Sequence, residues 1–124
     1  MKNILLVDDS EENCLLIAVW LNLKGYYVTS VHNGQEALDY LKDNKADVMF
    51  LDIDMPVMDG NQVIQTLKEQ GTIDDQYIVM LTACKDNNII LSCLRNGARD
   101  FIGKPFKKDS VFDALEKYES TLLG

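Results

Sequence analysis

Acidic side chains follow two short apolar runs in the chain. Asp8 and Asp9 come directly after residues 3–7, and Asp52 comes directly after residues 48–51. A short continuous apolar run closed by polar residues is typical of a strand that is buried on both faces of a sheet. A carboxylate at the end of such a strand is held on a fixed backbone and can meet water and ligands. Asp52 is therefore the first candidate for chemistry.

Two other polar side chains follow later apolar runs. Thr82 comes after residues 77–81, and Lys104 comes after residues 100–103. Strand patterns alternate with helix patterns along the whole chain, which predicts an α/β fold: a doubly wound sheet of five parallel strands in the order 2-1-3-4-5. Ligands of such sheets bind outside the carboxyl ends of the strands. We therefore expect three carboxylates, a hydroxyl and an ammonium to converge at one edge.

The elements that must position these groups follow from periodicity and from turn residues. The expected strands cover residues 3–7, 26–31, 46–51, 77–81 and 100–103. The expected helices cover residues 11–24, 35–42, 61–70 and 87–96, and a last helix is capped by Asp109 or Ser110. Ser10 is the expected cap of the first helix, and glycines 25, 71 and 97 are expected to end three of the helices. Residues 1–124 are expected to form a single domain.

Several acids at one edge repel one another unless a cation joins them. Oxygen ligands without His or Cys favour Mg²⁺ over Zn²⁺, with Mn²⁺ as a possible substitute. Mg²⁺ is usually held by one or two carboxylates together with waters and phosphate oxygens, so the site has room for a phosphoryl group. The carboxylate of Asp52 can accept that group covalently. Thr82 can donate a hydrogen bond to it, and Lys104 can supply positive charge.

Four segments resemble the motifs of the receiver domain of two-component response regulators. They are residues 7–10, 51–60, 80–83 and 97–106, in the order and spacing of that family, and the resemblance covers essentially the whole chain. It implies that Asp52 is the phosphoacceptor. It also implies that Asp9 and Asp52 bind Mg²⁺ directly and that Asp8 binds it through water. The backbone carbonyl of Asp54 would complete the protein ligands.

The same resemblance gives roles to residues near the carboxyl end of the sheet. Thr82 is the switch hydroxyl, Lys104 pairs with the phosphoryl group, and Phe101 is the switch aromatic residue. The family often has Tyr in place of Phe101, but a phenylalanine ring can still move between exposed and buried positions. The bond between Lys104 and Pro105 is expected to be cis. Asp54 and Cys84 stand where the family varies, at positions that influence how fast the phosphoryl group is hydrolysed.

The resemblance implies a signalling switch, not an enzyme, because the domain would catalyse only its own phosphorylation and dephosphorylation. Its partners would be a histidine kinase or a histidine phosphotransfer protein and a downstream target. Asp52 and Asp54 also look like the nucleophile pair of haloacid-dehalogenase-like phosphatases. That family places the pair on its first strand and has a cap and a longer chain. A receiver that only binds partners is a third reading, but the complete set of acids, Thr82 and Lys104 argues against it.

Composition excludes several classes of function. The chain has 124 residues and a net charge of −8, which argues against binding to nucleic acids or to anionic membranes. It has no apolar run long enough to span a bilayer and does not begin like a signal peptide. The three cysteines have no metal-type spacing and are interpreted as reduced thiols. These features predict a cytoplasmic protein.

The first predicted helix has an apolar outer side. Glu11 and Asn22 share a stripe with Leu15 and Ala18, which marks that stripe as the outer face. The predicted inner face carries Leu16, Ile17, Trp20 and Leu21. Leu15, Ala18 and Val19 then remain on or beside the solvent side. By resemblance, receivers dock their phosphodonors near this helix, so these residues form a candidate docking patch; scattered surface residues are the alternative.

Overall fold

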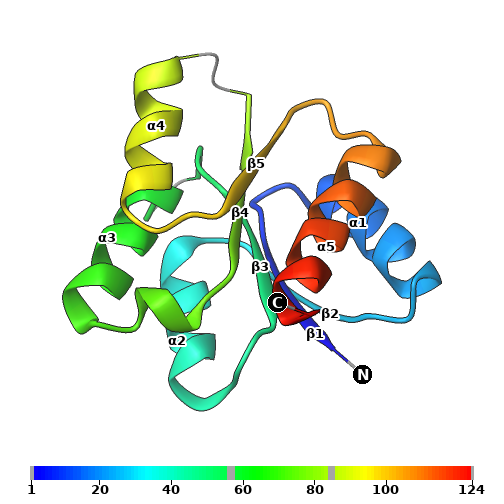
Figure 1. The fold of residues 1–124 in the computed structure, drawn as a ribbon, viewed down its shortest axis with the longest axis horizontal. Coiled ribbons are helices and arrows are strands. Elements are labelled where there is room, and N and C mark those ends of the chain that lie inside the picture. Colours follow the sequence, from blue (N-terminus) through cyan, green and yellow to red (C-terminus); the bar gives the residue numbers. More distant parts are fainter. Residues whose placement is uncertain (1, 56–57, 84–85, 124) are drawn as a thin grey trace.

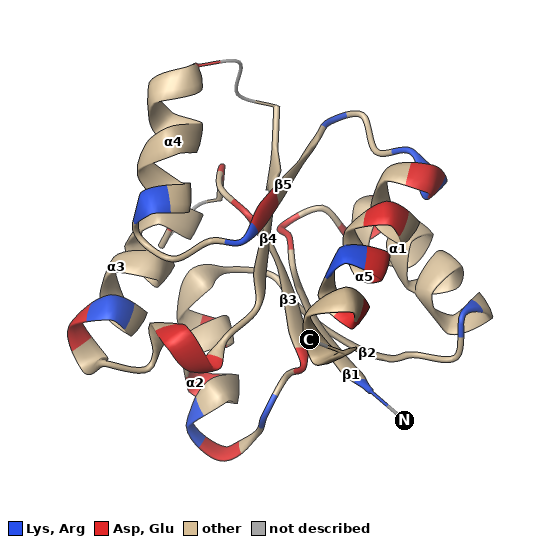
Figure 2. Ribbon diagram, in the orientation of Figure 1, with Lys and Arg blue, Asp and Glu red and all other residues tan. Residues whose placement is uncertain are grey.

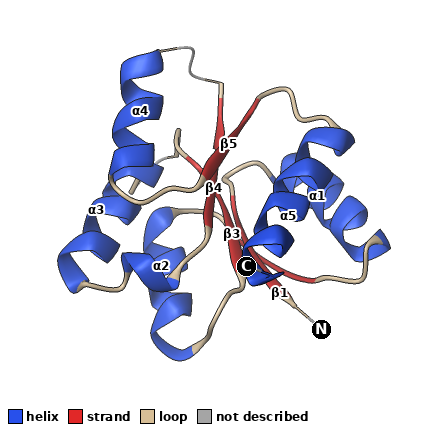
Figure 3. Cartoon of the chain, viewed as in Figure 1, coloured by secondary structure: helices blue, strands red, loops and turns tan. Residues whose placement is uncertain are grey.

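The computed structural model describes residues 2–55, 58–83 and 86–123. Five parallel strands form one sheet in the order β2-β1-β3-β4-β5, and helices cover both of its faces (Figures 1 and 3). α2, α3 and α4 lie on one side of the sheet and α1 and α5 lie on the other. The predicted doubly wound fold and its strand order are therefore confirmed.

The strands are all short, and each is followed by a helix. The strands are β1 (Asn3–Val7), β2 (Tyr27–Val31), β3 (Val48–Asp52), β4 (Ile78–Thr82) and β5 (Asp100–Gly103). The helices are α1 (Glu11–Leu23), α2 (Gly34–Asp43), α3 (Gly60–Gln70), α4 (Asn87–Arg95) and α5 (Lys108–Leu123), and a 3-10 turn, η1 (Ile73–Asp75), precedes β4.

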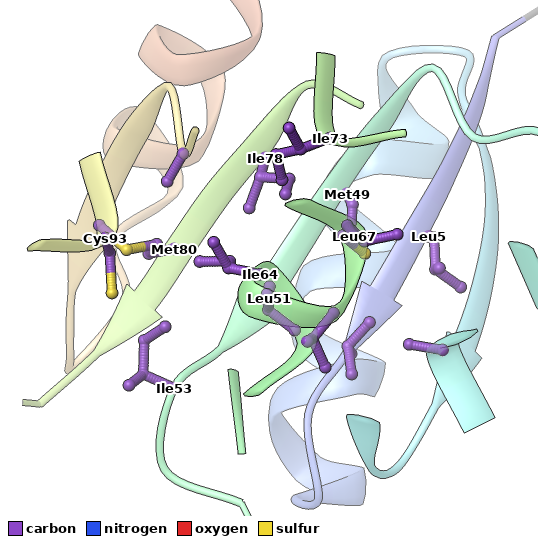
Figure 4. Close-up of a cluster of buried hydrophobic side chains, with 14 of the residues drawn as sticks. Leu5, Met49, Leu51, Ile53, Ile64, Leu67, Ile73, Ile78, Met80 and Cys93 are labelled. Carbon is purple, nitrogen blue, oxygen red and sulfur yellow. The ribbon is translucent and has the colours of Figure 1, made fainter. Parts of the chain in front are cut away.

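β3 lies at the centre of the sheet and is buried along its whole length. Met49 and Leu51 point into the cluster beneath α2, α3 and α4 (Figure 4), whereas Val48 and Phe50 point into the cluster beneath α1 and α5. Side chains alternate between the two faces of a strand. An apolar run without alternation is therefore what a strand covered on both faces requires.

The helix ends use the turn residues that the sequence indicated. The Ser10 hydroxyl accepts a hydrogen bond from the N–H of Asn13 at the start of α1. Gly71 ends α3 with a φ of 75°, in the left-handed region that favours glycine. Asp59 and Gln62 form a capping box at the start of α3, which fixes how the chain enters that helix.

Two helix predictions are wrong in detail. α5 begins at Lys108, so Asp109 and Ser110 lie in its first turn and neither is its cap. An acidic residue in the first turn still interacts favourably with the helix dipole. On α1 the buried residues are Cys14, Ile17 and Leu21, while Leu16 is 44% exposed. Leu16 precedes Ile17 by 100° of helix rotation, which carries it away from the sheet.

Charged residues are distributed over both layers. Figure 2 shows the Lys and Arg segments dispersed among helices and loops. No helix in the described part of the chain is both long enough and apolar enough to cross a membrane.

Candidate functional site

Asp52 ends β3 with a side chain that is fully buried. One carboxylate oxygen, Oδ1, accepts a hydrogen bond of 3.1 Å from the backbone N–H of Asp54. The other, Oδ2, lies 2.9 Å from Nζ of Lys104. The sequence predicted a carboxylate open to water. The structure instead places Lys104 against it, so access to Asp52 requires Lys104 to move or to be shared with a ligand.

Asp8 and Asp9 lie beside Asp52. Carboxylate oxygens of the three residues lie within 4.8 Å of one another, with Asp8 buried and Asp9 exposed. β1 and β3 are neighbours in register up to Val7 and Leu51, so the residues that follow each strand emerge at the same edge. The convergence of acids that the strand order predicted is present.

Asp8 is held by donors from the N-cap and first turn of α1. Its Oδ1 accepts from the N–H of Ser10 (2.9 Å) and its Oδ2 accepts from Nδ2 of Asn13 (3.3 Å). Nδ1 of His32 lies 3.2 Å from the Asp8 carbonyl oxygen. No motif in the sequence singled out Asn13, because an asparagine in the first turn of a helix carries no pattern of its own. This contact of His32 is to the backbone of Asp8.

Thr82 and Lys104 come from the next two strands. Thr82 is 3% exposed at the end of β4, and its carbonyl oxygen accepts the N–H of Lys104 at 2.9 Å. The peptide bond between Lys104 and Pro105 is cis, as predicted. Nζ of Lys104 also lies 4.0 Å from Oδ2 of Asp8. One ammonium therefore faces two buried carboxylates.

Burial governs the electrostatics of Asp52. It raises the pKa of Asp52 from 3.8 to about 6, and the negative charge of Asp8 adds to this, while the hydrogen bond from Lys104 acts in the opposite direction. The pKa of Lys104 is raised, because the carboxylates around it outweigh its own burial. The site thus holds more negative charge than Lys104 balances.

The side chains of the other predicted residues are exposed or half-buried. Phe101 on β5 is 45% exposed, and the side chain of Asp54 is exposed. Leu15 and Val19 on α1 are 69% and 56% exposed, and Ala18 is half-buried. Cys84 lies outside the described residues. The roles of all the site residues remain predictions.

A large cavity lies at the other end of the sheet. It has a volume of about 970 Å³ and is lined by residues that precede strands, among them Asp47, Tyr77 and Arg99. None of the predicted site residues lines it. Size alone therefore does not mark the place where the titratable groups of this fold converge.

A family model described as the response regulator receiver domain matches residues 4–116. The chain belongs to this family. It is 37% identical over 116 residues to the chemotaxis protein CheY of Bacillus subtilis, covering 92% of this chain and 94% of that one. It is 33% identical to sporulation initiation phosphotransferase F of the same organism, covering 94% and 93% of the two chains.

Receiver segments of longer proteins are also similar. Hybrid signal transduction histidine kinase D of Dictyostelium discoideum is 31% identical over 108 residues, which are 87% of this receiver but 7% of the kinase. Among solved structures, the response regulator TrrA of Thermotoga maritima in complex with Mg²⁺-BeF has a TM-score of 0.83 and 30% identity, covering 95% of this chain and 99% of that one. CheY4 of Vibrio cholerae has a TM-score of 0.87 and 28% identity, covering 95% of this chain and 98% of that one.

The receiver family and the strand order do not favour the phosphatase alternative. Asp52 and Asp54 follow the third strand along the chain, β3, and Asp8 and Asp9 follow the first, β1. The residues present fit a Mg²⁺ ion, since three carboxylates meet and no nitrogen or sulfur ligand belongs to that group.

Proposed function

We propose that this receiver accepts a phosphoryl group on Asp52 from a phosphohistidine residue of a histidine kinase or a histidine phosphotransfer protein. The observation that supports this most strongly is the buried carboxylate of Asp52, with Lys104 at 2.9 Å and two further acids within 4.8 Å. A hydrolase needs a group that activates water for turnover. This arrangement instead provides a nucleophile and charge compensation, which suits one transfer to the protein itself.

In the transfer, the bond between phosphorus and the imidazole nitrogen of the donor breaks. A bond forms between phosphorus and a carboxylate oxygen of Asp52. The bonding electrons remain on the imidazole nitrogen, which takes up a proton. Lys104 shifts its ammonium from the carboxylate to an oxygen of the arriving phosphoryl group, and the Thr82 hydroxyl donates a hydrogen bond to another.

Asp9 and Asp52 would bind Mg²⁺ directly, with Asp8 acting through water and the Asp54 carbonyl as a further ligand. When bound, the ion supplies positive charge that neutralises the acids and the phosphoryl oxygens. Asn13 and the N–H of Ser10 keep the Asp8 carboxylate in place. Mn²⁺ has the same preference for oxygen ligands and is expected to substitute.

The partner surface that we propose for the donor is α1, which starts directly after Asp8 and Asp9. Leu15 and Val19 are exposed there, and Leu16 at 44% exposure enlarges the patch beyond the predicted residues. An apolar patch beside a charged site can anchor a donor helix while the phosphohistidine reaches Asp52. Receivers of this kind act in the cytoplasm, which is the location we propose.

The test is intact-protein mass spectrometry after incubation with a small-molecule phosphodonor such as acetyl phosphate and Mg²⁺. We expect one phosphoryl group per chain, no modification of Asp52→Asn, and no modification in EDTA. Stoichiometric labelling of Asp52→Asn at an undiminished rate would contradict the proposal. Sustained turnover of a simple phosphomonoester by wild type would instead support the phosphatase alternative, in which Asp54→Asn would abolish activity.

A further inference from the structure

β2 and β5 are the two edges of the sheet. On β2, the N–H of Tyr27 donates to the carbonyl of Lys2 (3.0 Å), and the carbonyl of Val31 accepts from the N–H of Asp8 (3.1 Å). Both residues therefore direct their backbone groups toward β1. Backbone direction alternates along a strand, so Thr29 does the same. Val28 and Ser30 then direct their N–H and carbonyl groups toward the open side.

The open side of β2 lacks the features that usually protect an edge. The strand reads Tyr-Val-Thr-Ser-Val, with no charged residue and no proline, and Tyr27 is 59% exposed. Natural edge strands are commonly protected by charges, prolines or bulges. β5 has such protection: the carboxylate of Asp100 accepts the N–H of Phe101 (2.8 Å) and pairs with Lys117 (3.5 Å).

The residues that flank β2 limit the open segment. The N–H of Tyr26 donates to the carbonyl of Leu21 (3.1 Å), and the N–H of His32 donates to Oε1 of Glu36 (2.8 Å). Their donors are already used within the chain. A partner strand can therefore pair fully only with Val28 and Ser30. Thr29, the residue between them, is the natural centre of such a pairing.

We propose that β2 pairs antiparallel with β2 of a second copy, about a two-fold axis at Thr29. In this register Val28 lies opposite Ser30 of the second copy, and the two residues exchange both of their outward hydrogen bonds. The two-fold axis repeats this pair. Two-fold symmetry makes one strand complementary to itself, so the same patch serves both copies.

The side chains also suit this register. Tyr27 lies opposite Val31 of the second copy, and Thr29 lies opposite its own equivalent. Aromatic residues opposite β-branched ones, and threonine opposite threonine, are stabilising cross-strand pairs. No like charges meet across the axis, because the strand carries none. A second copy therefore matches the edge in hydrogen bonds, side chains and charge.

The pairing would extend the sheet across both copies and leave both Asp52 sites reachable. Antiparallel strands reverse the direction of the second sheet, so the two carboxyl edges would lie on opposite sides of the dimer. The proposed pairing involves only the sheet edge and does not require phosphorylation. It can be tested without Mg²⁺ or a phosphodonor.

Disulfide trapping tests the register. Residues opposite each other in a pair without hydrogen bonds have Cα atoms about 4.5 Å apart, which a disulfide can span. In a Cys84→Ser background, where the remaining cysteines Cys14 and Cys93 are buried, we expect Thr29→Cys to form a covalent dimer under mild oxidation. Tyr27→Cys or Val31→Cys alone should cross-link at least about ten-fold more slowly. In the proposed register Tyr27 lies opposite Val31 of the second copy, so neither single variant places two cysteines opposite each other. An equal mixture of these two variants should restore fast cross-linking.

Equal cross-linking rates for all three single variants would indicate random collision and overturn the proposal, as would slow cross-linking of Thr29→Cys.

Sedimentation equilibrium provides an independent test. The average mass of wild type should rise with concentration, and Thr29→Lys should hold it at the monomer value. The control Ser92→Lys adds the same charge on exposed α4 and should still associate. A wild type that stays monomeric up to its solubility limit would also overturn the proposal.

The charge of the added lysine distinguishes a specific effect on the proposed pairing from a non-specific effect on association. The chain carries a net charge of −8, so any added lysine reduces general repulsion between copies. A non-specific effect of Thr29→Lys would therefore favour association, whereas the proposed pairing brings two lysines face to face and opposes it. Matching circular dichroism and melting curves would show that the variant is folded.

Discussion

A carboxylate that is fully buried and hydrogen-bonded on both oxygens is the distinctive feature at the scale of single residues. Asp52 accepts from the N–H of Asp54 through Oδ1 and from Lys104 through Oδ2. Such contacts fix the carboxylate in one orientation, but they do not fully offset the loss of hydration, since its pKa is still raised. A bound cation, or a phosphoryl group that interacts with Lys104, would change the balance between the lost hydration of Asp52 and its hydrogen bonds. Such a change is what a switch requires.

The first prediction concerns the stability of Asp52→Asn without metal. A raised carboxyl pKa means that the folded state prefers the protonated form, so ionised Asp52 destabilises the fold above about pH 6. This destabilisation fades as the pH falls from about 6 toward 3.8, the ordinary value. In EDTA at pH 7.5, Asp52→Asn should therefore melt a few degrees higher than wild type, an order expected for about 1 kcal/mol in a domain of this size.

The difference in melting temperature should shrink as the pH is lowered and should vanish below about pH 4, where Asp52 is protonated in both states. Thermal melts monitored by circular dichroism between pH 4 and pH 8 measure it. A variant less stable than wild type at pH 7.5 would show that the ion pair with Lys104 outweighs burial, and the assigned cause of the shift would be wrong.

The second prediction is that Asp9, unlike the buried residues Asp8 and Asp52, affects stability mainly when Mg²⁺ is bound. Asp9 is exposed, so Asp9→Asn should change the melting temperature in EDTA very little. Mg²⁺ should raise the melting temperature of wild type, because it binds the folded state. Asp9→Asn should lose most of that rise. Glu12→Gln removes the same charge from the exposed side of α1 and should retain it. Equal Mg²⁺-induced rises in all three proteins would exclude Asp9 as a ligand.

At the scale of elements, the start of α3 is pressed against the end of β3. A Cβ atom on Gly60 would stand 2.7 Å from the carbonyl oxygen of Asp52 and 2.8 Å from Cα of Ile53. Both are backbone atoms that cannot give way without moving the strand end. The absence of a side chain at Gly60 is therefore part of how Asp52 is positioned.

The third prediction follows from that contact. Gly60→Ala should lower the free energy of unfolding by about 1–3 kcal/mol, the usual range for overpacking. It should also slow phosphorylation of Asp52 by small donors. Gly103→Ala is the control, since no atom lies within 4 Å of its added Cβ. Chemical denaturation of both variants measures the difference. If Gly60→Ala were as stable as Gly103→Ala, the start of α3 could shift away from the end of β3 at little cost in free energy. The prediction would then be wrong.

The fourth prediction tests α1 as the docking surface. Leu15→Lys or Val19→Lys should slow transfer from a phosphorylated histidine phosphotransfer protein at least several-fold, because an exposed apolar anchor becomes charged. Phosphorylation by acetyl phosphate should stay nearly unchanged. Leu123→Lys, at 91% exposure on the last turn of α5, is the matched control. Slowing with both donors would indicate a damaged helix, and slowing with neither would make the patch ordinary surface.

The sequence predicted elements better than helix faces. Continuous apolar runs identified β3 and β4 because both faces of these strands are covered. The face of α1 was misjudged because nearly every residue from Cys14 to Leu21 is apolar, so periodicity did not distinguish Leu16 from Ile17. On α4, helical spacing likewise favours an inward position for Ile89, which is 38% exposed. The placement of Lys104 on Asp52 depends on a loop conformation that no local pattern encodes.

At the scale of the whole molecule, the proposed phosphorylation of Asp52 would have to be communicated to a surface. Thr82 and Phe101 lie on adjacent strands, and the register pairs Met80 with Phe101 and Thr82 with Gly103. In the proposed switch, a shift of Thr82 toward a phosphoryl group on Asp52 would change the space beside β5. Phe101 is 45% exposed. Its ring can move inward, and such a movement would remodel the face formed by α4, β5 and α5.

The last prediction measures this coupling. In a Trp20→Phe background, Phe101→Trp reports its own exposure through quenching of fluorescence by acrylamide. Phosphorylation should reduce the quenching, because it biases the ring toward the buried position. Coupling of this kind is typically about 1–3 kcal/mol, whereas a nearly complete switch needs about 5.5 kcal/mol. The change should therefore be partial.

Asp52→Asn and Thr82→Val in the same background should remove the change in quenching. The first variant prevents phosphorylation, and the second removes the hydroxyl that links the phosphoryl group to the position of Phe101. Undiminished quenching in a fully phosphorylated protein would exclude Phe101 as the switch residue.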